Sequence, residues 1–358
     1  MQSASAARVR PVDHSPLVLP SARTRAPVRA HRAAALLNLN AKRVDRRTVK
    51  AFSGLLPEGD LFLSSTAEEG LRHVRAILEG GYSTVMLGGG DGTIAAAMEA
   101  FVKLGSELRF RNRLLPDLAI LKLGTGNALA AGVGADRPVE DARKVLSGET
   151  AGASVLRVLE AEGLSDAFSF GSIGYDAQIL NDYVDLVEQT PKLGRRFAKS
   201  MGGYALAIAT RTIPAELRRP KVRMKVTALG RASILDPETA EEIPLDTGAR
   251  LFDGEARAVL LGSSPCYGYG MRVLPYAQRR ADRFHLRVSL ASIPFVLANL
   301  PSIWKGTHRS DRFVDFLVEG ARVECSQPMP LQLSGDAAGT TDALEVRLSE
   351  RAFRLVHF

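Results

Sequence analysis

Cysteine is scarce in this chain of 358 residues, and its scarcity removes several classes of protein from consideration. The two cysteines, Cys266 and Cys325, form no CxxC pair and have no histidine at metal-ligand spacing. A zinc ribbon, a thioredoxin-type redox site and a secreted disulfide scaffold are therefore not expected. A chain of this size buries enough surface to fold without crosslinks, and we expect it to be cytoplasmic.

Long uncharged apolar runs are also absent from the sequence. No stretch reaches the roughly 18 apolar residues that indicate a transmembrane helix. The first 32 residues lack the apolar segment of about 7–15 residues that is typical of a signal peptide. We therefore expect any contact with a membrane to be peripheral.

Acidic residues are rare at the beginning of the chain, where residues 1–32 hold six arginines and one aspartate. This composition predicts a disordered basic tail. The net charge of the whole chain is +8, but the 41 Lys and Arg and the 38 Asp and Glu of residues 33–358 nearly cancel. A nucleic-acid-binding surface over the whole domain is therefore not indicated.

The first part of the ordered chain alternates between short apolar runs and helical patterns. Such alternation is typical of a parallel sheet covered by helices, so we expect an α/β domain over residues 33–150. Two of the helical patterns begin directly after glycine-rich turns. The expected strands are Ala33–Asn40, Asp60–Ser64, Thr84–Leu87 and Leu118–Leu123.

The second part of the chain is rich in short alternating stretches separated by Gly and Pro, which predicts antiparallel β structure over residues 151–340. A helical region is expected over residues 176–212, and residues 231–250 are expected to form an exposed loop or a long hairpin. Residues 341–358 are treated as a separate C-terminal segment.

Two glycine turns follow strands of the expected parallel sheet and carry the strongest functional signal. Ligands of open parallel sheets bind beyond the carboxyl ends of the strands. Glycines there allow backbone N–H groups to approach an anion, and a following helix N-terminus favours phosphate. The residues of the two turns are Gly88, Gly89, Gly90, Asp91, Gly92 and Thr93, then Gly124, Thr125, Gly126 and Asn127.

Familiar nucleotide motifs do not account for these turns. The pattern GxGxxG fails at Thr93 in the first turn and at Leu129 in the second. The chain contains no Walker A sequence, no GxSxG and no HExxH. A dinucleotide oxidoreductase and a P-loop NTPase are therefore disfavoured.

The order of the motifs resembles the diacylglycerol kinase catalytic domain superfamily, which includes bacterial lipid kinases, sphingosine kinases and ceramide kinases. The GGDGT turn is shared with NAD kinases, whereas the added GTxN turn favours the lipid-kinase branch. The similarity extends over roughly residues 33–358. Its later segments are Gly171–Ala177, which resembles Gly-x-Asp-Ala, and Gln332–Gly339, which resembles Gln-x-Asp-Gly-Glu-x-x-Gly.

The resemblance implies an ATP- and Mg²⁺-dependent kinase that phosphorylates the hydroxyl of a membrane lipid. It implies a nucleotide-binding domain followed by a β-rich lipid-binding domain, with the active cleft between them, and a C-terminal end that returns to the first domain. Contact with an anionic membrane surface is also expected, through the basic tail and the basic strand 218–225. The nucleotide-binding residues that it implies are Asn38, Lys42, Thr66, Gly88–Thr93, Gly124–Asn127 and Gly335.

Departures from the family pattern concentrate where a carboxylate is expected. The family's Asp-Gly-Glu is Ser334-Gly335-Asp336 here, and its first aspartate is a candidate general base. We therefore assign catalysis to Asp91 and Asp336, and metal binding to Asp336 and to Asp282, which is followed by Arg283 instead of the family's glycine. Restoring an aspartate at position 334 is expected to keep or raise activity.

Three functions remain open from the sequence. The first is the lipid kinase, acting on a diacylglycerol, ceramide or sphingoid-type substrate. The second is a protein that binds nucleotide and lipid with weak or no turnover, which Ser334 favours. The third is an NAD kinase-like enzyme, which would retain GGDGT.

Overall fold

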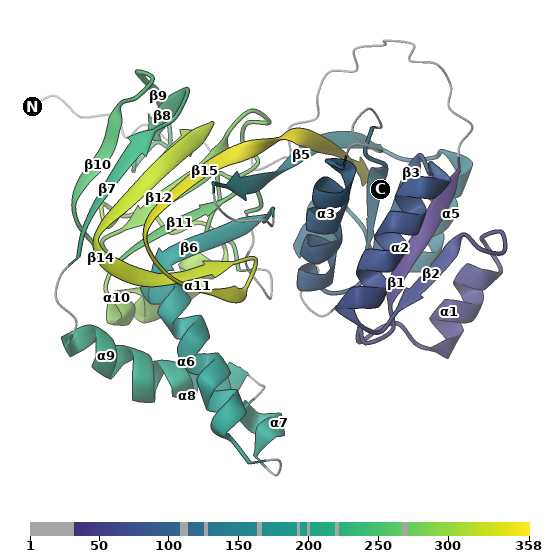
Figure 1. Ribbon diagram of the computed structural model, residues 1–358, viewed down its shortest axis with the longest axis horizontal. Helices are drawn as coiled ribbons and strands as arrows, with labels where there is room; N and C mark the ends of the chain where they lie inside the picture. The colour runs from purple at the N-terminus through teal and green to yellow at the C-terminus, as the bar shows by residue number, and fades with distance from the viewer. Residues whose placement is uncertain are drawn as a thin grey trace, which may run out of the picture.

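The computed structural model describes residues 32–107, 114–124, 128–162, 167–191, 194–198, 201–218, 222–265, 267 and 271–358. Two lobes stand side by side in Figure 1. The first lobe holds strands β1 to β4 with helices α1 to α5, and the second holds the remaining β-rich part. This order of a parallel sheet followed by β structure confirms the expected fold class.

The first lobe is built on four parallel strands in the order β2-β1-β3-β4. Their side chains are buried along nearly the whole of β1, β3 and β4, as expected for a parallel sheet covered on both faces. The strands end one or two residues from the limits that the sequence predicts. Their bounds are β1 Ala33–Asn38, β2 Leu61–Ser64, β3 Thr84–Gly88 and β4 Asp117–Leu121.

Helices cover both faces of this sheet and bury two separate apolar clusters against it. Phe52 of one helix and Val145 of another pack on Leu37 and Met86 on one face. On the opposite face, Ile77 and Phe101 pack on Val85. The helices are α1 Arg46–Ser53, α2 Ala67–Gly80, α3 Asp91–Gly105, α4 Ala128–Gly132 and α5 Pro138–Ser147.

The second lobe is antiparallel, with β14, β6, β11, β12, β13, β8 and β9 as neighbours in that order. Residues 231–250 form a hairpin of β8 and β9, one of the two forms expected. The short helices α10 Ile293–Ala298 and α11 Leu300–Trp304 also belong to this lobe. The strand bounds are β6 Phe170–Gly174, β7 Val222–Ala228, β8 Ala232–Leu235, β9 Glu242–Leu245, β10 Arg250–Ala256, β11 Ala258–Gly262, β12 Phe284–Ser289, β13 Phe313–Val318 and β14 Gly320–Leu333.

The basic stretch that includes β7 lies inside the sheet, between β10 and β14. Its alternate side chains are buried, while Arg223 and Lys225 point to the other face. There Arg223 pairs with Asp253 at 2.7 Å and Lys225 pairs with Glu324 at 3.1 Å. These two cations are therefore neutralised by neighbouring strands.

Two long strands connect the lobes: β5, Gly152–Ala161, and β15, Asp336–His357, which pair antiparallel. Near its end, β15 also pairs in parallel with β4, through Leu355 and Leu118. The ring of Phe353 packs against Phe101 of α3, with ring centroids 6.4 Å apart. The C-terminal segment thus contributes to the core of the first lobe.

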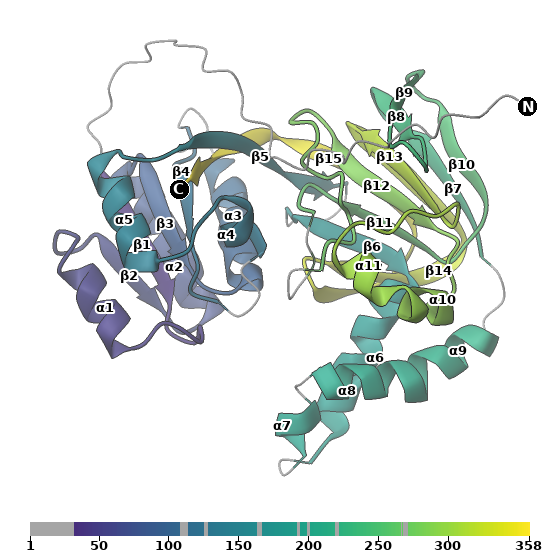
Figure 2. The same cartoon turned by 180° about the vertical axis from the view of Figure 1, so that it is seen from behind.

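The helical region of the second lobe projects away from its sheet in both Figure 1 and Figure 2. The sequence predicts one region over 176–212, but the structure divides it and extends it to Arg218. The first helix ends at Gln189 because Thr190 precedes Pro191 and is extended. The elements are α6 Tyr175–Gln189, α7 Arg195–Ala198, α8 Met201–Ala207, the π-helix η1 Ile208–Thr212 and α9 Ile213–Arg218. Within the residues that the structure describes, no helix is long and apolar enough to cross a membrane.

Candidate active site

The first glycine turn joins β3 directly to α3. Gly90 is the N-cap residue, with φ −80° and ψ 170°, and no side chain caps the helix. Among the residues that the structure describes, a Cβ atom added to Gly90 or to Gly92 would have no neighbour within 4 Å. Neither backbone conformation nor packing against described residues requires glycine at these two positions. The open space in front of the helix N-terminus is instead what a phosphate group needs in order to reach backbone N–H groups.

The second glycine turn lies against the first. A Cβ atom on Gly124 would be 2.4 Å from the Cα of Gly90 and 2.5 Å from the carbonyl oxygen of Gly89. Only glycine allows the two backbones to approach this closely. Thr125, Gly126 and Asn127, also predicted to bind nucleotide, lie outside the described residues.

Asn38 ties the turn after β1 to the first glycine turn. Its Nδ2 donates to the Oγ1 of Thr93 at 2.9 Å, and its Oδ1 accepts from the backbone N–H of Asn40 at 2.9 Å. Asn38 and Thr93 are therefore held at the same edge of the sheet as the glycine turns. Lys42 follows in the same turn with an exposed side chain.

Thr66 begins α2 at this edge and acts as its N-cap. Its Oγ1 accepts from the N–H of Glu69 at 3.2 Å. Glu69 in turn accepts from the N–H of Ser65 at 2.6 Å, and this hydrogen bond lowers the pKa of Glu69 below its usual value. Thr66 thus has a structural role that is independent of nucleotide.

Asp91 is the first residue of α3, so the backbone of this predicted catalytic residue lies in the first glycine turn. The position of its side chain lies outside what the structure describes. Its assignment as a catalytic residue stays a prediction.

The second lobe presents the turn between β14 and β15, which carries Ser334, Gly335 and Asp336. Ser334 and Gly335 both have positive φ, of 51° and 90°. Asp336 is exposed at the first position of β15. The Oγ of Ser334 donates a hydrogen bond to the Oε1 of Glu99 on α3. This hairpin therefore touches the first lobe on the helix that begins at the glycine turn.

A cluster of polar side chains forms hydrogen bonds with the turn that carries Ser334 and Gly335. Gln332 accepts from the N–H of Gly335 at 3.0 Å and donates to the Oγ of Ser172 at 3.1 Å. Ser172 donates to the Oδ2 of Asp176 at 2.7 Å. Burial raises the pKa of Asp176, which keeps only part of its surface exposed. Hydrogen bonds from Ser172 and Gln332 oppose this rise. The cluster joins the segments Gly171–Ala177 and Gln332–Gly339, which are far apart in the sequence.

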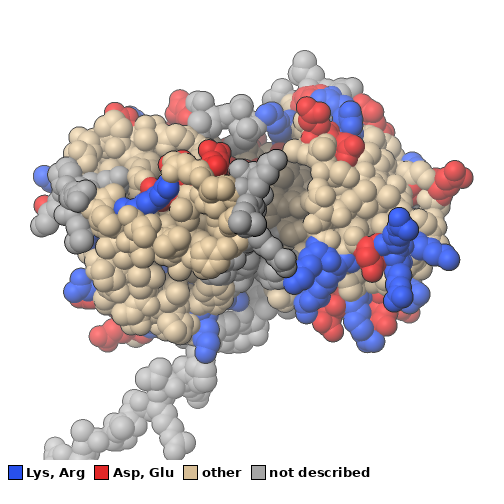
Figure 3. Space-filling model, turned by 90° about the horizontal axis from the view of Figure 1, so that it is seen from below, with Lys and Arg blue, Asp and Glu red and all other residues tan. Residues whose placement is uncertain are grey.

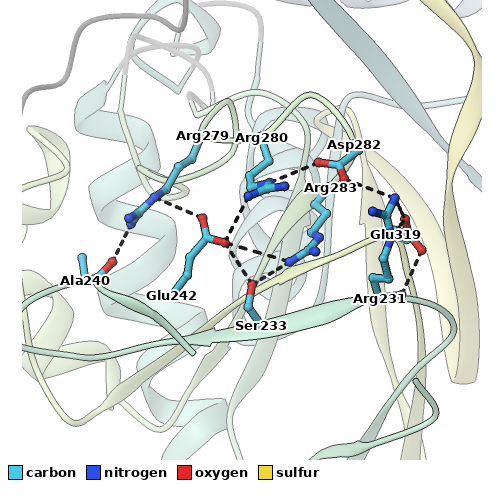
Figure 4. A network of polar contacts seen from close by, with 9 residues as sticks. All are labelled: Arg231, Ser233, Ala240, Glu242, Arg279, Arg280, Asp282, Arg283 and Glu319. Atoms are coloured by element: carbon cyan, nitrogen blue, oxygen red, sulfur yellow. Dashed lines mark hydrogen bonds and ion pairs between the residues drawn. The ribbon is translucent and has the colours of Figure 1, made fainter. Parts of the chain in front are cut away.

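Asp282 lies in a different place, just before β12, within a network of arginines and carboxylates (Figure 4). It pairs with Arg280 at 3.2 Å and with Arg231 at 3.3 Å. Burial favours a higher pKa for Asp282, but hydrogen bonding to Arg280 and its charge outweigh burial and lower the pKa. Two arginines occupy the positions in which a cation would bind, so the structure lends no support to a metal at Asp282.

The two glycine turns fit a nucleotide, because the open positions at Gly90 and Gly92 form a cradle that a Cβ would fill. Among the residues that the structure describes, no three His, Cys, Asp or Glu side chains gather as metal ligands. Mg²⁺ in kinases is held by one or two carboxylates together with the substrate phosphates. The exposed carboxylate of Asp336 fits such a ligand set.

Two residues of this site were missed from the sequence, Glu99 and Ser169. The N–H of Ser169 donates to the Oγ of Ser334 at 3.2 Å. Neither residue belongs to a recognisable motif, and no sequence signal marks them.

Comparisons with known proteins agree with this arrangement. The family model of the diacylglycerol kinase catalytic domain matches residues 34–158. A protein of Alcanivorax borkumensis named probable lipid kinase YegS-like is 26% identical over 331 residues, 90% of this chain and 95% of its own length. A protein of the same name from Citrobacter koseri is 32% identical over 262 residues, 71% of this chain and 74% of its own.

A solved structure shares the fold across both lobes. A diacylglycerol kinase of Bacillus anthracis superimposes with a TM-score of 0.60 at 14% identity, covering 92% of this chain and 97% of its own. The paired glycine turns, the hairpin of Ser334 and the extent of these similarities lead to one conclusion. The chain belongs to the family of YegS-like lipid kinases, which share the diacylglycerol kinase catalytic domain.

Proposed function

We propose that this protein transfers the γ-phosphate of ATP to the hydroxyl of a membrane lipid, of the diacylglycerol, ceramide or sphingoid class. The observation that carries the proposal is the pair of glycine turns in backbone contact, with open space at Gly90 and Gly92. The hairpin of Ser334 brings the second lobe to the same helix. In this proposal the active cleft lies between the two lobes.

Phosphoryl transfer depends mainly on positioning and on stabilisation of charge. The backbone N–H groups at the start of α3 would bind the phosphates, and the turn at Gly124 would enclose them. Asn38 orients Thr93 beside them. Asp336 and Asp91 would hold Mg²⁺, which supplies charge neutralisation on the β- and γ-phosphates when it is bound.

The lipid must reach this site from a membrane, and the first lobe carries exposed cations suited to an anionic surface. Lys and Arg side chains gather on the right-hand lobe in Figure 3. Those of α1 and the turn before it form no ion pair among the described residues, although Asp45 and Asp136 lie near enough to act electrostatically on Arg47 and Arg43. Five of these cations are exposed, namely Lys42, Arg43, Arg46, Arg47 and Lys50.

This basic patch, residues 42–50, is a second proposed membrane contact in addition to strand 218–225, in which the side chains of Arg218, Arg219 and Lys221 lie outside the described residues. Arg223 and Lys225 are paired with carboxylates, whereas the patch lies at the edge of the sheet where β1 ends. The basic tail lies outside the described residues.

One assay distinguishes the three functions left open by the sequence. The full-length protein is incubated with labelled ATP and Mg²⁺, and diacylglycerol, ceramide, sphingosine and NAD are offered separately. Label in a lipid supports the proposal, and label in NAD alone contradicts it. ATP binding without transfer to any acceptor would identify a binding protein, the second candidate, which the serine at position 334 favours.

A further inference from the structure

The hydroxyl of Ser334 can accept a proton from one group and donate its own proton to another. We propose that Ser334 and Glu99 form a proton relay, in which the lipid hydroxyl passes its proton to Ser334 while Ser334 passes its own proton to Glu99. The inference rests on the proposed function and assigns a role to Glu99, a residue without any motif.

The hydrogen bonds of Ser334 leave one position for a substrate. Its O–H donates to Glu99, and its oxygen accepts from the N–H of Ser169 at 3.2 Å. A hydroxyl oxygen has two lone pairs, so one remains to accept from the hydroxyl of a lipid. The backbone N–H of Ser334 is bound to the carbonyl oxygen of Phe170 at 2.8 Å, which holds the turn in place.

Glu99 meets the second lobe through Ser334. It lies in α3, the helix that begins at the first glycine turn, and its carboxylate accepts from the hydroxyl of Ser334. Ser334 belongs to the turn between β14 and β15, two residues before Asp336. The relay therefore begins in the hairpin that carries the carboxylate assigned to Mg²⁺ and ends on the first lobe.

A buried residue fixes the position of the Ser334 hydroxyl. Ser169 is 2% exposed, and its backbone N–H donates to the Oγ of Ser334. This contact and the one to Glu99 hold the hydroxyl between the two lobes.

The chemical step balances without a further reactant. The lipid oxygen forms a bond to the γ-phosphorus, and the bond from that phosphorus to the β–γ bridging oxygen of ATP breaks. The lipid proton moves to Ser334, the Ser334 proton moves to the carboxylate of Glu99, and ADP leaves. Glu99 is half-buried and returns the proton to solvent before the next turnover.

The test compares Glu99→Gln, Ser334→Ala and the double variant in steady-state lipid phosphorylation. A glutamine oxygen still accepts from Ser334 but takes no proton, so contact between the lobes is kept. For Glu99→Gln we expect kcat to fall at least about 10²-fold, whereas the KM values for ATP and lipid and the melting temperature should not change. Glu58→Gln, an exposed carboxylate of the same lobe, is the matched control and should retain full activity.

The double variant tests whether the two residues act as one unit. Groups of a single relay are non-additive, so we expect the double variant to be no slower than the slower single variant. Full kcat in Glu99→Gln, or additive losses in the double variant, would overturn the relay while leaving the kinase function intact. If the wild-type protein phosphorylates no lipid, the proposed function fails and the relay fails with it.

Discussion

Ser334, in the hairpin of the second lobe, donates a hydrogen bond to Glu99 in helix α3 of the first lobe. The family pattern has an aspartate at position 334, which would place two carboxylates in contact here. In this chain the carboxylate of the contact therefore belongs to Glu99, and position 334 supplies a hydroxyl group.

This contact changes the expectation for restoring the family residue. Ser334→Asp suits the positive φ of 51° better than serine does, but its charge opposes that of Glu99. We expect kcat to fall at neutral pH and the Ser334→Asp, Glu99→Gln double variant to recover activity above Ser334→Asp alone. Lipid phosphorylation by the four proteins measures this, and activity of Ser334→Asp at or above wild type would contradict it.

Gly90→Val tests the phosphate cradle. The extended backbone of Gly90 tolerates a side chain, and no described atom lies within 4 Å of its Cβ position. We expect a folded protein whose Kd for ATP rises at least tenfold, about 1.4 kcal/mol, because the branched side chain occupies the space of a phosphate. Isothermal titration calorimetry measures the affinity.

Gly70→Val is the control for this substitution, since Gly70 also has open space around its Cβ position but lies within α2. Its affinity for ATP should remain that of wild type. Normal ATP binding by Gly90→Val would remove the phosphate-cradle assignment.

Asp91 and Asp336 are predicted to serve the nucleotide and its metal. Asp91→Asn should nearly abolish turnover while leaving the fold intact, because the amide keeps the shape of the side chain but removes the negative charge assigned to Mg²⁺. Asp336→Asn should raise the Mg²⁺ concentration needed for half-maximal rate and lower kcat. Mg²⁺ titrations of lipid phosphorylation measure both, with the exposed Asp246→Asn as control. Full activity of both variants would show that the chemistry lies elsewhere.

The patch of residues 42–50 should bind anionic vesicles. Each basic residue near an anionic surface contributes about 1 kcal/mol, so reversing Arg46 and Arg47 to glutamate should weaken binding at least about tenfold. Reversing Arg223 and Lys225, which are already paired with carboxylates, should have little effect. Sedimentation with phosphatidylserine-containing vesicles at low and high salt measures this. Equal binding to neutral vesicles would refute an electrostatic contact.

A buried ion pair in the second lobe predicts how stability depends on pH. Asp315 accepts from Arg287 at 2.7 and 2.9 Å. Burial opposes ionisation, yet the positive charge of Arg287 holds the pKa of Asp315 well below its usual value. A carboxyl whose pKa is lower in the folded chain stabilises it above about pH 4 and loses that contribution as the pH falls further.

Asp315→Asn leaves the charge of Arg287 buried without its partner. We expect a loss of about 3–5 kcal/mol in the free energy of unfolding at pH 7, and a smaller difference from wild type below pH 4. Urea denaturation at both pH values measures the difference. The exposed Asp311→Asn should match wild type, and an equal loss at both pH values would rule out the ion pair as its cause.

The amino-acid sequence alone determined the parallel sheet and its two glycine turns. These features are local: apolar runs, a helical pattern after each turn and glycines where strands end all lie within a few residues of one another. Thr93 and Gly124 were assigned to one site from such patterns and Asn38 from the family resemblance, and the structure places all three at one edge of the sheet. The edge follows from topology, since parallel strands end on the same side.

The tertiary structure alone decided the contacts between distant segments. Alternation predicts the basic strand 218–225 but not its neighbours, and pairing of residues 222–228 with both β10 and β14 placed this stretch inside the sheet. Glu99 lies in an ordinary helix, 235 residues from Ser334. Only the packing of one lobe on the other brings them together, because the period of a helix or strand carries no information about which distant side chain it will meet.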